Sequence, residues 1–190
     1  MVVVTMGLRV QFLISFVFIL CFCSCDKKAI YINKKSKFLE LRKTPALFNH
    51  LPINGFIYDL YPNGDTLSVG FYKNGLKSGL WKVYYKDGVL KEERYFKKNK
   101  RQGLYIGFYK NGTKNFSYTF LNDEYNGTNT VWASNGKKIE EHNYVNGYEE
   151  GPQKTWYLNG KIKSNYVIIN NRRYGLLGTK NCINVGDEIL

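Results

Sequence analysis

The sequence is poor in the residue types from which most catalytic and metal sites are built. It has only 2 histidines and 4 cysteines in 190 residues, and 15 acidic residues against 28 basic ones. His50 and His142 do not stand in a metal-ligand spacing with Cys, Asp or Glu. No phosphate-binding loop, nucleophile motif or dinucleotide fingerprint occurs. We therefore expect a chain that is not an enzyme, with no catalytic residues, no bound metal and no cofactor.

Three adjacent acid pairs are the remaining candidates for acid–base chemistry. They are Glu92-Glu93, Glu140-Glu141 and Glu149-Glu150. Neighbouring residues on a strand face opposite sides, so the two carboxylates of one pair do not act together. We expect solvated strand ends at these places. Cys182, the thiol near the C-terminus, has no evident histidine partner.

Long apolar runs are absent except at the N-terminus. Residues 1–24 contain one charged residue, Arg9, followed by the run VQFLISFVFILCFCS. A positive charge before a short apolar run predicts a targeting segment over residues 1–24. The run is short for a comfortable membrane span, and an uncleaved anchor helix stays the alternative.

The end of this run resembles the lipobox of bacterial lipoproteins. Ser24 precedes Cys25, although Phe22 and Cys23 stand where Leu and a small residue are usual. The resemblance implies cleavage before Cys25, lipidation of that residue and a lipid-anchored location in a bacterial cell envelope, in the outer or inner membrane. Residues 25–54 would then form the acylated cysteine, a basic tether and an N-terminal cap. Lipidation of Cys25 leaves Cys182 unpaired, which argues against a disulfide scaffold.

Basic residues give the chain a formal charge of +13. Such a surface favours anionic neighbours, among them phospholipid headgroups and acidic glycans. Nucleic acid is an unlikely partner because an exported chain meets little of it. The predicted basic patch lies at two turns, and its alternative role is to keep a sheet edge soluble. The patch comprises Lys97, Lys98, Lys100, Arg101, Arg172 and Arg173.

The segment SKFLELRK, residues 36–43, predicts a short helix. Phe38, Leu39 and Leu41 would point inward. A helix here would lie before the first strand of the array that follows. We expect it to cover the first edge of the sheet.

A period of 24 residues governs the rest of the chain, with copies opening at Gly55, Gly79, Gly103, Gly127 and Gly151. We number each copy from its opening glycine as position 0. Positions 8 and 9 are Asn-Gly or Asp-Gly in every copy, which predicts a type I′ hairpin turn. A second turn is predicted at positions 19 and 20.

Segments between the turns are rich in Tyr, Phe, Val, Ile and Thr, as strands prefer. A single hairpin cannot bury its own face, but hairpins stacked side by side can. The sequence therefore predicts an all-β fold: a single-layer, elongated antiparallel meander of about five 24-residue hairpins over residues 55–178. Residues 179–190 would form a C-terminal tail. Large apolar residues at positions 5, 6 and 17 predict aromatic rows on both faces.

The stretch GLWKVYYKDG, from residue 79, with Tyr-x-x-Gly further on, resembles the bacterial MORN-repeat variant. That family is also catalogued under a YwqK-type antitoxin label. The resemblance implies a scaffold that contacts protein, glycan or membrane surface, with an antitoxin that neutralises a partner toxin as the alternative. Asn129, Ala133 and Gln153 depart from the family pattern, so a surface built on the aromatic rows should weaken toward the C-terminus.

Aromatic residues beyond the needs of one core face are the candidates for a binding surface. The alternative is that these rings only stack on each other. The candidates are Trp81, Tyr85, Tyr105, Tyr109, Trp132 and Trp156.

Overall fold

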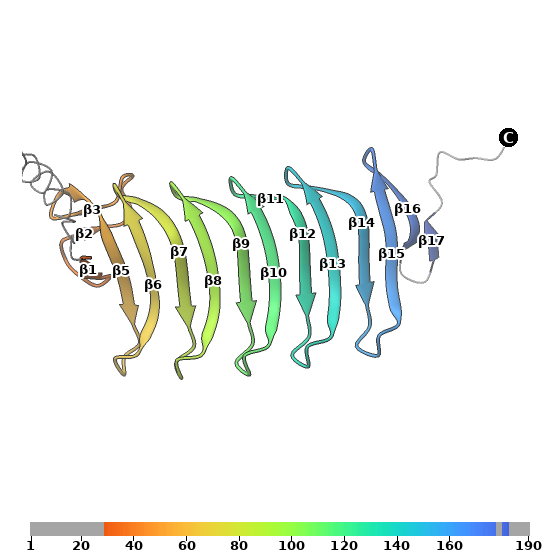
Figure 1. Ribbon diagram of the computed structural model, residues 1–190, viewed down its shortest axis with the longest axis horizontal. Helices are drawn as coiled ribbons and strands as arrows, with labels where there is room; N and C mark the ends of the chain where they lie inside the picture. Colours follow the sequence, from red (N-terminus) through yellow and green to blue (C-terminus); the bar gives the residue numbers. More distant parts are fainter. Residues whose placement is uncertain (1–28, 178–179, 183–190) are drawn as a thin grey trace, which may run out of the picture.

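The computed structural model describes residues 29–177 and 180–182, and in these residues it contains strands, turns and loops but no helix. Fourteen strands form one sheet, and three short strands form a second, small sheet at its N-terminal end. The large sheet is an elongated ribbon one layer thick (Figure 1). The predicted all-β, single-layer architecture is confirmed.

Consecutive hairpins build the ribbon, and from β5 to β17 each neighbouring pair in the sheet is antiparallel. After the hairpins, β16 (Arg172–Leu177) and β17 (Lys180–Cys182) continue the sheet, and β11 (Glu124–Tyr125) pairs with β10 beside the main path. The hairpins are β5 (Gly55–Leu60) with β6 (Thr66–Lys73), β7 (Leu76–Tyr84) with β8 (Leu90–Lys97), β9 (Lys100–Phe108) with β10 (Lys114–Leu121), β12 (Gly127–Trp132) with β13 (Lys138–Val145), and β14 (Tyr148–Trp156) with β15 (Ile162–Ile169).

The loops at positions 6 to 10, which we call the lower loops, are not the type I′ turns that the sequence predicted. Only their glycine has a positive φ, for example 90° at Gly64, whereas Asn63 does not. Gly64 N–H donates to Tyr61 O at 3.0 Å, and Tyr61 N–H to Asp65 O at 2.9 Å. This is the pattern of a type I turn closed by a left-handed glycine, which makes a bulge. The Asn or Asp is there because its Oδ1 accepts the N–H two residues on, as Asn135 does from Lys137 at 3.1 Å.

The type I′ geometry occurs instead at positions 19 and 20, the upper turns. Both central residues have positive φ in every one: Asn74 and Gly75 at 51° and 72°, and Lys98 and Asn99 at 51° and 70°. Asn and Gly tolerate this region at little cost. Successive upper turns are also joined, because Asn99 N–H donates to Lys77 O at 3.0 Å.

From the second copy on, the glycine that opens each copy sits at a bulge between one hairpin and the next. Gly79, Gly103 and Gly151 have φ of 69°, 73° and 76°. A Cβ on these residues would meet nothing within 4 Å, so backbone conformation and not space requires glycine. Gly70 differs, since a Cβ there would come within 2.0 Å of the Trp81 ring.

The N-terminal cap corrects a second prediction. Residues 36–43 form turns and the strand β2 (Leu39–Glu40), not a helix, and pair through β3 (Leu47–Phe48) with β4 (Leu51–Pro52). The first sheet edge is covered by β1 (Tyr31–Asn33), which pairs parallel with β5. Eight residues are too few for a helix to form without strong packing, and here short strand pairs satisfy the backbone.

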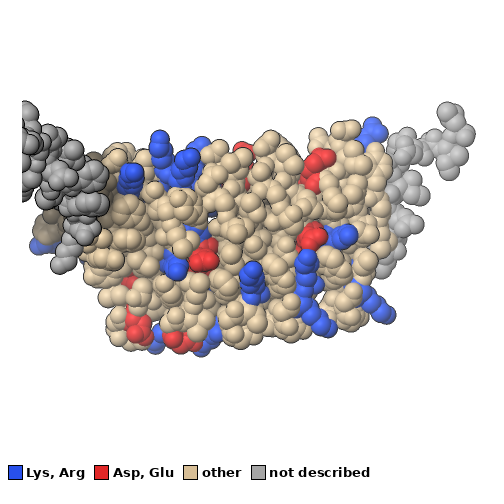
Figure 2. All heavy atoms as spheres, viewed as in Figure 1, with Lys and Arg blue, Asp and Glu red and all other residues tan. Residues whose placement is uncertain are grey.

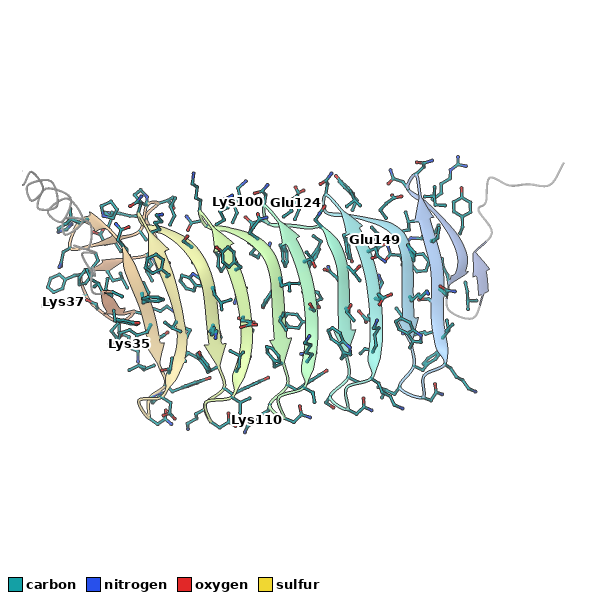
Figure 3. All side chains as sticks on the ribbon, viewed as in Figure 1. Lys35, Lys37, Lys100, Lys110, Glu124 and Glu149 are labelled. Carbon is teal, nitrogen blue, oxygen red and sulfur yellow. The ribbon has the colours of Figure 1, made fainter. Side chains whose placement is uncertain are left out.

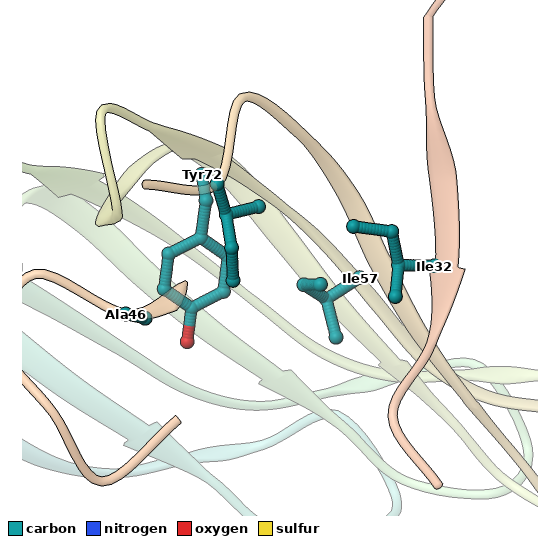
Figure 4. Packing of buried hydrophobic residues seen from close by; sticks show 5 residues of the cluster. Ile32, Ala46, Ile57 and Tyr72 are labelled. Atoms are coloured by element: carbon teal, nitrogen blue, oxygen red, sulfur yellow. The ribbon is translucent and has the colours of Figure 1, made fainter. Parts of the chain in front are cut away.

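Beneath the cap lies the one buried cluster of apolar side chains in the described residues. Ile32, Ile53, Ile57 and Tyr72 pack there with Ala46 (Figure 4). Leu39 and Leu41 pack against this cluster, as predicted, whereas Phe38 is 52% exposed. The cap is bonded to the first upper turn through Ala46 N–H to Gly75 O and Gly75 N–H to Ile53 O, both 2.8 Å. It therefore closes the N-terminal end of the ribbon.

Candidate interaction surfaces

One face of the sheet, the ring face, buries a row of side chains from positions 2 and 17. Trp81 contacts Tyr72 and Phe96 at ring distances of 5.3 and 5.7 Å. Its Nε1–H donates to Phe71 O at 3.2 Å. The candidate binding residue Trp81 therefore packs inside the repeat array, and the expected stacking of rings along the ribbon is present.

Tyr105 occupies the same position in the next copy. Its hydroxyl donates to Glu92 Oε2 at 2.6 Å, and the Arg94 guanidinium lies 4.9 Å over its ring. Burial and the neighbouring Glu92 carboxylate raise the pKa of Tyr105 to about 12. Glu92, which the sequence placed among solvated strand ends, is instead half-buried and paired with Arg94.

The row changes from rings to amides in the last two copies. Gln153 is fully buried, and its side chain both accepts from Asn143 N–H at 3.0 Å and donates to Asn143 O at 2.9 Å. Asn129 accepts from Thr119 N–H at 2.8 Å. These amides bond backbone groups at the bulges between hairpins, a role that aromatic periodicity could not reveal.

Long side chains from the upper ends of strands cover the rings. The Arg101 guanidinium lies 4.1 Å over the Phe120 ring, and Arg173 lies 5.4 Å over Tyr166. Lys77 lies over both Trp81 and Phe96, and burial, followed by repulsion from Arg94, lowers its pKa. Two of the six residues of the predicted basic patch are thus used for packing, and Arg101 and Arg173 also pair with Asp123 and Glu149.

Tyr85 and Tyr109 belong to the lower loops and not to a strand face. Tyr85 donates to Phe108 O and Tyr109 to Trp132 O, each at 2.9 Å, so each hydroxyl bonds the following copy. Trp132 and Trp156 are half-buried at strand ends, with Lys114 and Lys138 about 6 Å over their rings (5.9 and 6.0 Å). The six aromatic candidates therefore lie in three places and do not form one surface.

The upper edge of the ribbon carries the other members of the basic patch together with exposed apolar residues. Figure 2 shows basic side chains along this edge above the N-terminal half, and Figure 3 labels Lys100 and Glu124 there. Lys97, Lys98 and Lys100 surround one turn and are exposed, as is Arg172 further along. At the strand ends that flank the later upper turns, the exposed apolar residues are Leu121 at 41%, Val145 at 51%, Tyr148 at 76% and Ile169 at 51%.

A groove opens on the face opposite the ring face, at the N-terminal end. It has a volume of about 560 Å³, and Tyr31, Tyr58 and Tyr84 line it together with Asp65 and Asp87. Figure 2 shows acidic side chains at the lower edge below the first strands. No sequence prediction included this groove, because its residues come from four strands and two loops.

His142 lies on the ring face beside Glu149, whose Oε1 is 3.6 Å from its Nδ1. This buried nitrogen makes no hydrogen bond.

The residues described contain no group of three or more His, Cys, Asp or Glu that is able to hold a metal. Residues 29–177 and 180–182 also contain no helix that could span a membrane. Cys25 lies outside the described residues, as does the side chain of Cys182.

Two parts of the chain match a known family model. Residues 77–98 and 149–167 match the MORN repeat variant. The match therefore covers two separate segments of the ribbon. The first matched segment is the hairpin of β7 and β8, and the second covers most of β14 and β15. A search of curated proteins gives no match. Such repeats indicate a scaffold, and the fold agrees with hairpins that depend on their neighbours.

Proposed function

We propose that this MORN-variant ribbon is a non-catalytic scaffold of a bacterial cell envelope, tethered through lipidated Cys25, with its upper edge against an anionic membrane surface. The tether rests on the sequence of residues 1–28. The orientation rests on the structure of the upper turns.

The observation that carries the proposal is the make-up of that edge. Three successive upper turns expose Leu121, Val145 and Ile169, while lysines surround an earlier turn. Apolar groups at the strand ends beside these turns, together with lysines, match the two parts of a membrane surface: acyl chains and anionic headgroups. Each lysine near such a surface contributes about 1 kcal/mol, and each buried methylene about 0.8 kcal/mol.

The edge is held in a fixed line by contacts between turns. Asp123 N–H donates to Arg101 O at 3.1 Å, and Gly147 N–H to Tyr125 O at 2.8 Å. The turns thus need little ordering on contact, which lowers the entropic cost of binding.

Vesicle sedimentation tests the orientation. A chain of residues 26–190 should bind vesicles rich in phosphatidylglycerol and bind phosphatidylcholine vesicles weakly. Leu121→Ser with Val145→Ser and Ile169→Ser should weaken binding, and Lys97→Glu with Lys98→Glu should do so mainly at low salt.

A matched control changes the lower edge. Leu158 is 60% exposed there and Lys110 is exposed as well. Leu158→Ser with Lys110→Glu should bind like the unmodified chain; equal losses from both edges would contradict the proposed orientation. Nothing in the described residues favours the antitoxin alternative, which stays a prediction.

A further inference from the structure

The groove on the opposite face has a chemistry that the rest of the array lacks. Its walls are the rings of Tyr31, Tyr58 and Tyr84, and its lower rim holds the carboxylates of Asp65 and Asp87. No lysine or arginine lines it, although the chain carries a net charge of +13. An anionic, aromatic-walled groove on a basic protein selects for a cation with apolar substituents.

The other copies act as internal controls, because they share the backbone but not these side chains. Asp65 stands at position 10 and Asp87 at position 8 of their copies. Carboxylates occur at neither position in the three copies that follow. There position 10 is Thr113, Lys137 and Lys161, and position 8 is Asn111, Asn135 and Asn159. The turn itself therefore does not require the acids.

Neighbouring bonds hold the walls in place. Tyr31 lies on β1, which pairs with β5, and its ring stacks on Phe56 at 5.0 Å. The backbone that carries Tyr84 is held by the Tyr61 hydroxyl, which donates to the Tyr84 carbonyl at 2.8 Å. Tyr31 remains 62% exposed toward solvent. Aromatic faces held this way attract organic cations.

One carboxylate of the rim already pairs with an ammonium group. Lys110, from the next copy, places Nζ 3.2 Å from Asp87 Oδ2, yet its side chain is 73% exposed and is therefore free to be displaced. Figure 3 labels Lys110 at the lower edge. The Asp65 side chain accepts a hydrogen bond from the neutral Asn63 amide, at 2.6 Å.

We propose that this groove is a binding site for a quaternary ammonium group. The tyrosine rings contact the methyl groups and the two aspartates neutralise the charge, while the volume of about 560 Å³ leaves room for whatever bears the group. The site is independent of the membrane-facing upper edge.

Ligand-detected NMR on the full chain in deuterated non-ionic micelles tests the site with tetramethylammonium chloride. Saturable transfer to the ligand methyls is expected in the millimolar range. The neutral isostere tert-butanol should bind at least about tenfold more weakly. Equal binding of the two, or no saturable binding of the cation, would overturn the proposal.

Variants separate the rim from the walls. Asp65→Asn with Asp87→Asn should weaken binding at least about tenfold, and Tyr31→Leu should also weaken it. Lys110→Ala should tighten it, because the competing ammonium is gone. Glu124→Gln with Glu140→Gln, at exposed sites outside the groove, is the matched charge control and should change nothing. A control that weakens binding as much as the rim variant would mean general charge attraction and would reject the site.

Two further probes identify the source of the group. Glycerophosphocholine represents a lipid headgroup, and acetyl-trimethyllysine amide represents a modified side chain. The probe that binds more tightly identifies the class of partner. If neither probe competes with tetramethylammonium, the assignment of the site to a biological ligand is overturned.

Discussion

The two halves of the ribbon share one backbone but are held together by different chemistry. From β5 to β10 the ring face contains Trp81, Tyr105 and Phe120 and is closed at its end by the cap. From β12 to β15 the matching positions hold Asn129 and Gln153, which bond backbone groups. The side chain at position 2 therefore either bonds the backbone groups of the bulge or covers them. An amide does the first, and an aromatic ring does the second.

The largest difference between the halves should come from Trp81→Ala. This variant loses ring contacts with Tyr72 and Phe96 and a hydrogen bond, so unfolding free energy should fall by about 3 kcal/mol. Urea denaturation followed by circular dichroism measures it. Trp156→Ala, at a half-buried strand end, is the matched variant and should cost less. Equal losses would contradict a ring-based N-terminal half.

Gln153→Leu tests whether bonding, not volume, holds the C-terminal half. The side chain keeps its size, but Asn143 N–H and O lose their partners, which should cost about 2 kcal/mol. Hydrogen exchange at the Asn143 amide should speed up. A leucine variant as stable as the unmodified chain would show that packing decides there too.

Gly79→Ala and Gly151→Ala should have the same effect in both halves. Both glycines have positive φ and room for a Cβ, so each change should cost about 1–2 kcal/mol through backbone conformation. Thermal unfolding of the two variants checks this. Clearly unequal shifts would show that the bulges are not equivalent.

Ala133→Tyr should give the C-terminal half a hydrogen bond between copies that the N-terminal half already has. Tyr61, Tyr85 and Tyr109 each donate to the next copy, and Ala133 interrupts that series. A tyrosine there is positioned to donate to Trp156 O and to raise stability by about 0.5–1.5 kcal/mol. Tyr109→Phe, measured in the same urea assay, should lose a similar amount; a gain without the matching loss would point to packing instead.

The smallest expected effect concerns pH, at Tyr105 of the N-terminal half. The pKa of Tyr105 is raised from 10.0 to about 12 by burial and by Glu92. The neutral phenol therefore stabilises the fold fully below pH 10, and this contribution is lost as pH rises through 12. Phenolate absorbance in an alkaline titration reports this pKa, which Glu92→Gln should lower. An unchanged titration in that variant would exclude the carboxylate as a cause.

Much of this architecture was readable from spacing. The period of 24 residues, the turn pairs and the strand-forming segments predict a single-layer meander, which the structure has. Type I′ turns were assigned to the wrong end of the hairpin, because Asn-Gly suits both turn types and only loop length separates them. The helix over residues 36–43 was wrong because local propensity yields to pairing with β3.

The candidate surfaces were less predictable. Trp81 and Tyr85 look alike as surplus rings, yet one packs on the ring face and the other bonds the next copy. The groove is not predictable from spacing, because Tyr31 reaches it only through the parallel pairing of β1 with β5. Residue spacing shows on which face of its hairpin a side chain lies. It does not show which side chains of the next hairpin that side chain contacts.

The amino-acid sequence alone determined that this chain forms repeated hairpins, since the turn residues and strand alternation act within each copy. Tertiary structure alone decided which rings are covered, which amides bond the bulges and where carboxylates meet tyrosines. Those outcomes depend on the bulge between copies, whose shift in register sets the contacts of every side chain across the boundary.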